Sequence, residues 1–291
     1  WSEPQQPTME GFEKLSSYKP GWRLVESGPV RQVVEMRQGI NHVTILQRVI
    51  LFSDLKQVDF ETSLLKWDGT KYREFRLAFP LKMQAGRVAY EVPFGTVEVG
   101  NSEMKGAAGE RYTTEVSALH PRSIQNWIGA SDNDIGVTIS SSVAVWDYLD
   151  PTDQPMNSLL LQPVLLASRR SCHGAGPWYL QAGDHHYRFS LTTHRSGWRN
   201  GRRFGVAANT PLAVVFNPVT SPRPTLPEEK GFFSLNVDNI ALSTIKKCED
   251  DDNIVIRLYE DAGKDVSARL RFAAPLRGAE MTNIIEEEGK P

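Results

Sequence analysis

The sequence predicts an antiparallel all-β sandwich, and three features carry that prediction. Runs of alternating apolar and polar residues recur along the chain, turn-forming residues separate these runs, and no comparable stretch repeats with the helical period of 3.6 residues. Apolar residues at every second position lie on one face of an extended strand, so each run predicts a half-buried strand. Many such strands without helices between them are typical of a sandwich rather than of an α/β fold.

Four runs show the alternation most clearly, at residues 57–64, 75–79, 187–191 and 265–272. The segment 42–52 is instead apolar on both faces at its C-terminal end, which predicts a strand buried between two layers. Turns are expected where Gly, Asp and Asn gather, at residues 67–70, 131–136 and 260–264.

A proline-rich stretch divides the chain. Four prolines lie between Asn217 and Pro227, and proline has no backbone donor and cannot occupy a central strand. We therefore predict a semi-rigid connector over residues 217–232, between a large β-sandwich domain, residues 1–216, and a smaller C-terminal β subdomain, residues 233–291. The smaller part resembles a meander of about three strands. Because so few strands do not close a core, we expect it to be truncated and to pack on the larger sheets.

Composition and charge restrict the classes of function. The 33 basic and 35 acidic residues nearly cancel, so no nucleic-acid partner is expected. No segment approaches the roughly 20 consecutive apolar residues of a membrane helix, so no membrane span is expected. The two cysteines, Cys172 and Cys248, exclude a four-cysteine zinc site and leave a single bridge between them open.

Short catalytic and metal-binding motifs are missing from the sequence. It has no Gly-x-Ser-x-Gly elbow, no phosphate-binding P-loop and no His-Glu-x-x-His pair. The segment 132–136 resembles a calcium loop, but its glycine comes one residue early and Val143 stands where a closing Glu is needed, which favours a hairpin turn. His185 and His186 are neighbours on a predicted strand and point to opposite faces, so a structural role is favoured over a metal pair.

Three further features have two interpretations each. The arginines of segment 195–205, around Trp198, could bind an anion or stack on a sugar or base, but the interspersed glycines favour a mobile surface loop. The seven tryptophans are interpreted mainly as core anchors, with sugar stacking as the alternative. The acidic run 249–252 is expected to be a solvated hairpin turn.

Several motifs resemble, in the same order, the C-terminal region of glycoside hydrolase family 38, the α-mannosidases. The first two are Arg-Leu-Ala-Phe-Pro-Leu at 76–81 and Ala-Tyr-Glu-Val-Pro-Phe-Gly-Thr-Val-Glu at 89–98. Further matches lie at residues 134–137, 183–189, 254–260 and 281–286. The similarity covers roughly residues 30 to 286, and it implies a large antiparallel β-sandwich of the galactose-mutarotase-like supersandwich type with a small C-terminal β-meander.

The resemblance implies that the catalytic machinery lies outside this chain. Members of the family are retaining α-mannosidases with an Asp nucleophile and a divalent metal ion, usually zinc, in an N-terminal barrel and helical bundle. On this basis we expect no catalytic residue, metal site or cofactor in the fragment, and we expect it to be inactive alone. Zinc or another divalent ion is expected in the missing catalytic domain. The expected partners are that domain and a glycan substrate.

One loop departs from the family pattern. Family members carry an Arg-Arg pair and then an Arg-Gly-x-Gly loop that reaches toward the active site, whereas here Arg169 and Arg170 are followed by His173-Gly174-Ala175-Gly176. The resemblance makes Arg169, Arg170 and His173 the candidate substrate-binding residues. Because His is shorter than Arg and only partly charged at neutral pH, either the substrate contact differs or the loop is used otherwise. A glycine-rich turn without a ligand is the alternative.

Two other functions remain open from the sequence. A free-standing carbohydrate-binding module would need exposed aromatic side chains in a row. An aldose-epimerase-like enzyme would need a Glu/His acid–base couple on one concave face of the sandwich.

Overall fold

A computed structural model describes residues 12–83, 85–102, 121–150, 152, 155–171, 175–216 and 227–287. The predicted antiparallel all-β fold is confirmed, because every pair of neighbouring strands runs antiparallel. The chain forms two compact units: Trp1–Val92 with Val97–Leu212, and Pro93–Thr96 with Ala213–Pro291. Most of the predicted connector, residues 217–226, lies outside the described residues. None of the described helices is long and apolar enough to cross a membrane.

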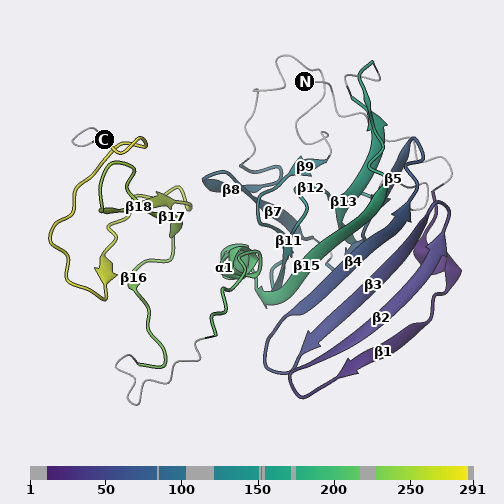
Figure 1. Cartoon of the computed structure of the whole chain (residues 1–291), viewed down its shortest axis with the longest axis horizontal. Coiled ribbons are helices and arrows are strands. Elements are labelled where there is room, and N and C mark those ends of the chain that lie inside the picture. Colours follow the sequence, from purple (N-terminus) through teal and green to yellow (C-terminus); the bar gives the residue numbers. More distant parts are fainter. Residues whose placement is uncertain are drawn as a thin grey trace. The chain divides into compact units, whose positions relative to one another are not determined.

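A nine-stranded sheet forms one layer of the first unit (Figure 1). A short 3-10 helix, η1 (Leu15–Tyr18), precedes it. In spatial order the strands are β1 (Trp22–Ser27), β2 (Arg31–Ile40), β3 (Val43–Phe52), β4 (Val58–Trp67), β15 (Gly183–Arg195), β11 (Ile135–Ser141), β10 (Trp127–Ser131), β7 (Arg87–Val92) and β8 (Gly95–Glu98).

The second layer is a smaller sheet organised by one long strand, β13 (Leu159–Arg170). Its neighbours are β14 (Trp178–Tyr179), β12 (Val145–Asp147), β5 (Arg73–Arg76) and β6 (Phe79–Leu81), and β9 (Arg122–Ser123) pairs with β12. Because β13 bonds to four other strands, it fixes where its last residues, Arg169 and Arg170, emerge.

Apolar side chains fill the space between the two sheets. The rings of Phe79, Trp146 and Phe189 contact one another, with centroids 5.7–6.0 Å apart. Leu64 and Ile139 from the large sheet belong to the same cluster. Burying side chains of this size is the main stabilising term of a sandwich. The core-anchor interpretation holds for Trp67, Trp127 and Trp146, which are buried, whereas Trp22 is half exposed.

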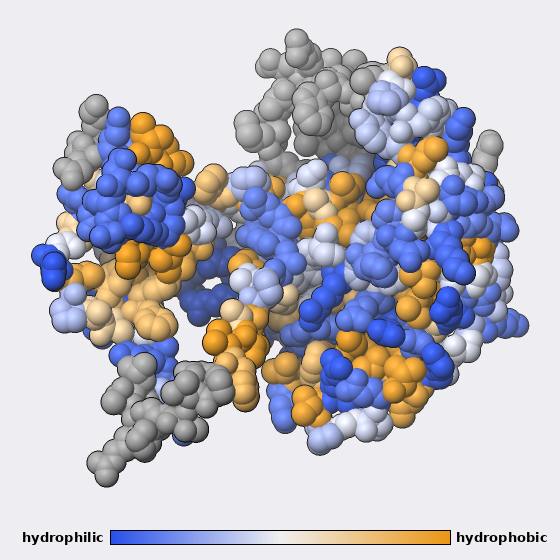
Figure 2. Space-filling view, in the orientation of Figure 1, coloured by the Kyte–Doolittle hydropathy of each residue, from blue (hydrophilic) through white to orange (hydrophobic). Residues whose placement is uncertain are grey.

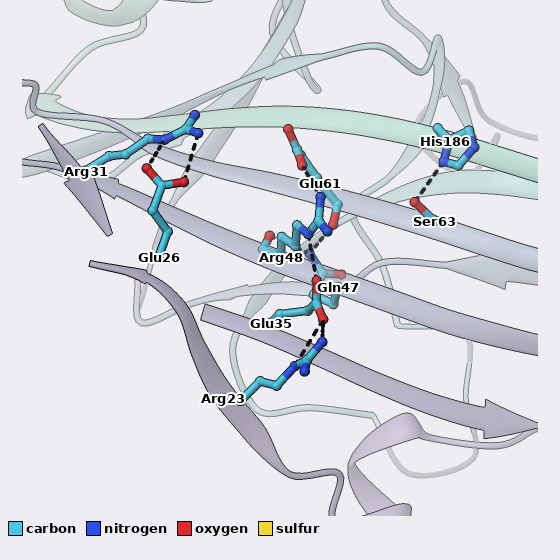
Figure 3. A network of polar contacts seen from close by, with 9 residues as sticks. All are labelled: Arg23, Glu26, Arg31, Glu35, Gln47, Arg48, Glu61, Ser63 and His186. Carbon is cyan, nitrogen blue, oxygen red and sulfur yellow. Dashed lines mark hydrogen bonds and ion pairs between the residues drawn. The ribbon is translucent and has the colours of Figure 1, made fainter. Parts of the chain in front are cut away.

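The opposite face of strands β1–β4 carries a ladder of alternating charges (Figure 3). Arg23, Glu35, Arg48 and Glu61 stand directly opposite one another on successive strands. Glu35 is 5% exposed and accepts hydrogen bonds from Arg23 Nη2 at 2.5 Å and from Arg48 Nε at 2.8 Å. These two bonds hold the pKa of Glu35 below its usual range. The ladder therefore gives the buried carboxylate of Glu35 two cationic partners. The visible surface of the first unit mixes hydrophilic and apolar residues (Figure 2).

Helix α1 (Arg199–Ala208) corrects the expectation that segment 195–205 is a mobile surface loop. The helix packs on β10, β11 and β15. Its two buried residues are Gly201 and Gly205, which are one turn apart, and Gly205 lies against the ring of Trp127. Glycine has a low helix propensity, so the glycines of this segment suggested a loop and the helix was missed.

A histidine is held beneath this helix. Nδ1 of His194 donates to the carbonyl of Arg195 at 2.7 Å, so Nε2 accepts from the hydroxyl of Thr138 at 2.8 Å. Burial lowers the pKa of His194, which favours this neutral tautomer. The helix, β11 and β15 therefore meet at one satisfied polar contact.

Two strand predictions need correction. The alternation at 265–272 becomes a strand only at β19 (Leu270–Phe272), because its partner β16 (Phe233–Leu235) is only three residues long. β3 is the strand predicted at 42–52, but it is not buried on both faces, since Leu51 is 46% exposed. The predicted turn at 131–136 is confirmed: the carboxylate of Asp132 accepts the backbone N–H groups of Asp134 and Ile135.

The second unit contains two small sheets, β16–β19 and the hairpin of β17 (Ile240–Lys247) and β18 (Ile254–Glu260). The acidic run 249–252 lies in the turn of this hairpin, as predicted. Glu286 ties the C-terminal segment to the hairpin, because Lys246 and Arg257 donate to its carboxylate at 2.9 and 3.3 Å. The bond from Lys246 is the largest cause that lowers the pKa of Glu286 to about 2.

The docking of α1 is tested by adding one methyl group. In Gly201→Ala, the new Cβ would overlap the Thr138 hydroxyl and the His194 ring, so the helix must lift. We expect a loss of about 1–3 kcal/mol in unfolding free energy, as for other overpacked sites. The control Gly39→Ala adds the same group where nothing lies within 4 Å and should leave stability unchanged or slightly raised. Equal denaturation midpoints for the two variants would contradict the packing described.

The charge ladder is tested by Glu35→Gln. Because the pKa of Glu35 is lowered in the folded state, its stabilisation is present above the unfolded pKa of about 4.3 and is lost as pH falls below it. We expect a loss on the order of 1 kcal/mol at pH 7, since both arginines are partly solvated. The difference in Tm between wild type and variant should shrink from pH 6 to pH 3. A difference that stays constant with pH would show that the carboxylate charge is not what stabilises the ladder.

Candidate functional site

Turns from four parts of the chain meet at one end of the first unit. We call this the turn cluster and define it as residues 41–42, 66–72, 168–171 and 175–185. The indole N–H of Trp67 donates to the carbonyl of Leu180 at 2.8 Å, and the backbone N–H of Tyr72 donates to the carbonyl of Ser168 at 2.9 Å. These bonds join loops that are about 100 residues apart in sequence.

The turn cluster concentrates unusual backbone geometry. Four non-glycine residues in it have positive φ: His42 at 69°, Lys66 at 57°, Tyr72 at 57° and Gln181 at 51°. Residues other than glycine rarely adopt this backbone conformation, and it persists only where the surroundings enforce it. Asp184 provides one such restraint, because its carboxylate accepts the Lys66 N–H at 2.7 Å. Strain of this kind gathers at functional sites, which directs attention to this end of the sandwich.

Arg169 and Arg170 end β13 inside the turn cluster, and their side chains have different surroundings. Nη2 of Arg169 lies 3.5 Å from the carboxylate of Glu74, which also accepts from Arg76 at 2.5 Å. Nε of Arg170 donates to the carbonyl of Gly176 at 3.0 Å, and its guanidinium lies 5.5 Å from the ring centroid of Trp178. Adjacent residues of a strand point to opposite faces, so the two arginines do not form one fork.

His173, the third predicted substrate-binding residue, lies outside the described residues, as do Cys172 and Gly174. The described cysteine, Cys248, is a free thiol in the second unit. The open question of a bridge between Cys172 and Cys248 therefore falls partly outside the described chain.

A shallow depression adjoins both predicted arginines. Its volume is about 380 Å³, at the lower end of the range for ligand sites. Leu165 and Ala167 contribute apolar surface, and Arg169, Tyr179 and Gln181 contribute polar groups. An apolar surface with a few convergent donors suits a sugar, which has both hydroxyl groups and C–H faces.

Sequence reasoning missed the side chains around Trp178. The ammonium of Lys71 lies 4.7 Å from the indole centroid, and the ring of Tyr72 packs edge-on against it at 5.0 Å. Tyr72 is 70% exposed. Lys71 and Tyr72 follow the segment 67–70, which the sequence marks only as a turn, and no local signal links that turn to Arg170 a hundred residues later.

His185 and His186 both make hydrogen bonds within the fold. His185 Nε2 bonds to the carbonyl of Gln181 at 2.6 Å, and His186 Nδ1 bonds to Ser63 Oγ at 2.9 Å (Figure 3). Across the described ranges, no group of three or more His, Cys, Asp or Glu side chains could hold a metal ion. Nδ1 of His42 lies 2.7 Å from the carboxylate of Asp68, whose pKa is lowered by hydrogen bonds from Thr70 and then from His42.

Comparison with known proteins identifies two matching family models. Residues 10–144 match the glycosyl hydrolases family 38 C-terminal domain, and residues 239–291 match the family 38 C-terminal beta sandwich domain. Together the two models cover more than half of the chain.

Curated relatives and solved structures agree with these models. The chain is 24% identical to alpha-mannosidase G of Dictyostelium discoideum over 99% of its own length and 25% of that protein, and 22% identical to alpha-mannosidase 2C1 of Mus musculus over 83% and 21%. It therefore spans about a quarter of the length of these relatives. Among solved structures, an alpha-mannosidase from Enterococcus faecalis V583 shares its fold with a TM-score of 0.68 at 15% identity, over 92% of this chain and 32% of that one. The chain belongs to glycosyl hydrolase family 38, and it corresponds to the C-terminal region of that family.

Proposed function

We propose that this chain is the non-catalytic C-terminal β-sandwich region of an α-mannosidase-like glycoside hydrolase. In this role it supports a separate catalytic domain and lends the turn cluster to a shared sugar site. The observation that carries the proposal is the depression beside Arg169 and Arg170, at the end of the sandwich where four turns meet. The mannosidase names of the relatives supply the reaction class.

The chemistry of bond cleavage is assigned to the catalytic domain. Retaining glycosidases use a nucleophile and an acid on either side of the scissile bond, and in this proposal both lie in that domain together with zinc or another divalent ion. The partners proposed for this chain are the catalytic domain and a glycan substrate. Its own contribution is to bind and orient the glycan.

The surroundings of Arg169 suit it for orienting a sugar. Its carboxylate partner Glu74 is bonded to Arg76, and Arg76 Nη1 donates to the carboxylate of Asp147 at 2.9 Å. Glu74, Arg76 and Asp147 are largely buried, so the position of Arg169 is set before a ligand arrives. A preorganised donor loses less conformational entropy on binding than a free side chain does.

A free-standing carbohydrate-binding module is the second candidate. It is favoured by two exposed tyrosines in the turn cluster, Tyr72 and Tyr179, which are 70% and 55% exposed. The two candidates differ in whether the chain needs a catalytic domain to recognise its glycan.

The proposed sugar contact is tested in the complete enzyme with Arg170→Ala. If Arg170 or the loop it holds contacts remote sugar units, kcat/KM on extended mannose glycans should fall. The fall should correspond to about 1–3 kcal/mol of lost transition-state stabilisation, as for a lost charged hydrogen bond. Small aryl α-mannosides should be affected less. Arg203→Ala, at an exposed position of α1, is the matched control.

Stability must be measured beside the kinetics. A purely structural Arg170 would lower the Tm and leave kcat/KM of the folded enzyme alike for both substrates. Equal losses on both substrates, or kinetics indistinguishable from Arg203→Ala, would remove this loop from the sugar site.

A further inference from the structure

Two cations share one aromatic ring in the turn cluster. The ammonium of Lys71 and the guanidinium of Arg170 lie 4.7 and 5.5 Å from the ring centroid of Trp178. Their separation therefore cannot exceed roughly 10 Å, which is about the Debye length at 0.1 M salt, so each charge feels the other. Contact with an indole face is worth only about 0.5–1 kcal/mol at exposed sites. The ring alone is a weak counterpart for two positive charges.

The acids of this region are engaged elsewhere. Glu74 pairs with Arg76 and Arg169, and Asp68 bonds to His42 and Thr70. Within the described residues no carboxylate pairs with Lys71 or Arg170. Arg76 and Arg169, which do have a carboxylate partner, differ from Lys71 and Arg170 in this respect. Two cations therefore face the ring of Trp178 without an acid beside them in the described chain.

Backbone bonds hold this pair in place. Arg170 stands directly opposite Trp178 in the ladder of β13 and β14, and its Nε donates to the carbonyl of Gly176. Lys71 precedes Tyr72, whose positive φ and N–H bond to Ser168 fix the turn against β13. The two cations are therefore brought together by strand pairing rather than by chance contact of long side chains.

An anion at this edge would be bound by complementary groups. A guanidinium can donate two parallel hydrogen bonds to a phosphate or carboxylate, and an ammonium adds a compact charge. The exposed ring of Tyr72, which packs against Trp178 at 5.0 Å, offers an apolar face beside these charges. A sugar ring that carries an acidic group presents both features.

We infer that Lys71, Arg170, Trp178 and Tyr72 form a subsite for an anionic group of a sugar, either a phosphate or a carboxylate. This inference deepens the proposed function and rests on it in taking the ligand to be a glycan. It names an acidic sugar unit as a class of ligand for the turn cluster, in addition to neutral mannose.

Direct binding to the 291-residue chain tests the inference. Mannose 6-phosphate, glucuronate, mannose and inorganic phosphate would be titrated separately, with binding followed by calorimetry and by the fluorescence of tryptophan. At least one acidic sugar should bind more tightly than both mannose and inorganic phosphate, and its binding should weaken as salt is raised from 50 to 500 mM.

Lys71→Gln is the decisive variant, because the described contact of the Lys71 side chain is the Trp178 ring and no hydrogen bond of the fold is lost. It should weaken binding of the acidic sugar by about tenfold, as expected for one charged contact. Arg203→Gln removes the same charge from α1 and should leave binding unchanged. Tyr72→Ala should weaken the acidic sugar and leave inorganic phosphate unaffected.

Several results would overturn the inference. These are equal binding of mannose and both acidic sugars, inorganic phosphate binding as tightly as the tighter of the two acidic sugars, or equal affinities for Lys71→Gln and Arg203→Gln. The assay uses no turnover, so its failure is separate from that of the proposed function. If the acidic subsite were disproved, Arg170→Ala would still be expected to lower kcat/KM on neutral extended glycans.

Discussion

Backbone pairing along β13 is the constraint on which the described site depends. This strand bonds to β5, β6, β12 and β14, and its apolar residues, such as Leu161, face the core between the sheets. The same strand ends at Arg169 and Arg170, so packing energy gained in the core fixes two charged side chains at the edge. Because the N–H of Tyr72 bonds to the carbonyl of Ser168, the turn that carries Lys71 is fixed by the same strand. The position of the turn cluster therefore depends on the packing of β13 in the core.

The large sheet is covered differently on the face that points away from the core. There the strands are covered in two ways: by helix α1, which approaches closely because Gly201 and Gly205 have no side chains, and by the charge ladder centred on Glu35. The buried carboxylate of Glu35 between two arginines is favourable only while it is ionised, and His194 under α1 is favourable only while it is neutral. Both arrangements weaken in acid: the contribution of neutral His194 is lost as pH falls below its unfolded pKa of about 6.5, and that of ionised Glu35 as pH falls below about 4.3.

The fold was largely predictable from sequence because alternation at period two is a local signal. Strand β4 follows directly from it, and the turn after Asp132 follows from the Asp, Asn and Gly residues gathered there. Helix α1 was not predicted, because its two buried glycines have a low helix propensity and suggested a loop. The candidate site could be anticipated only in part: the family resemblance proposes Arg169 and Arg170, which stay predictions, but Lys71 and Tyr72 reach Trp178 through long-range pairing that no sequence pattern encodes. Leu51 shows the same limit, because exposure depends on how far the second layer extends.

The central claim is that this region binds and supports but does not cleave, and turnover by the purified chain tests it most directly. An aryl α-mannoside would be incubated with the 291-residue protein in the presence and absence of added zinc. The account predicts no release of the aryl group above the uncatalysed rate, because the nucleophile and acid are assigned to the catalytic domain. Turnover that rises in proportion to the chain, persists through repeated purification and is unaffected in a preparation lacking host glycosidases would contradict the account.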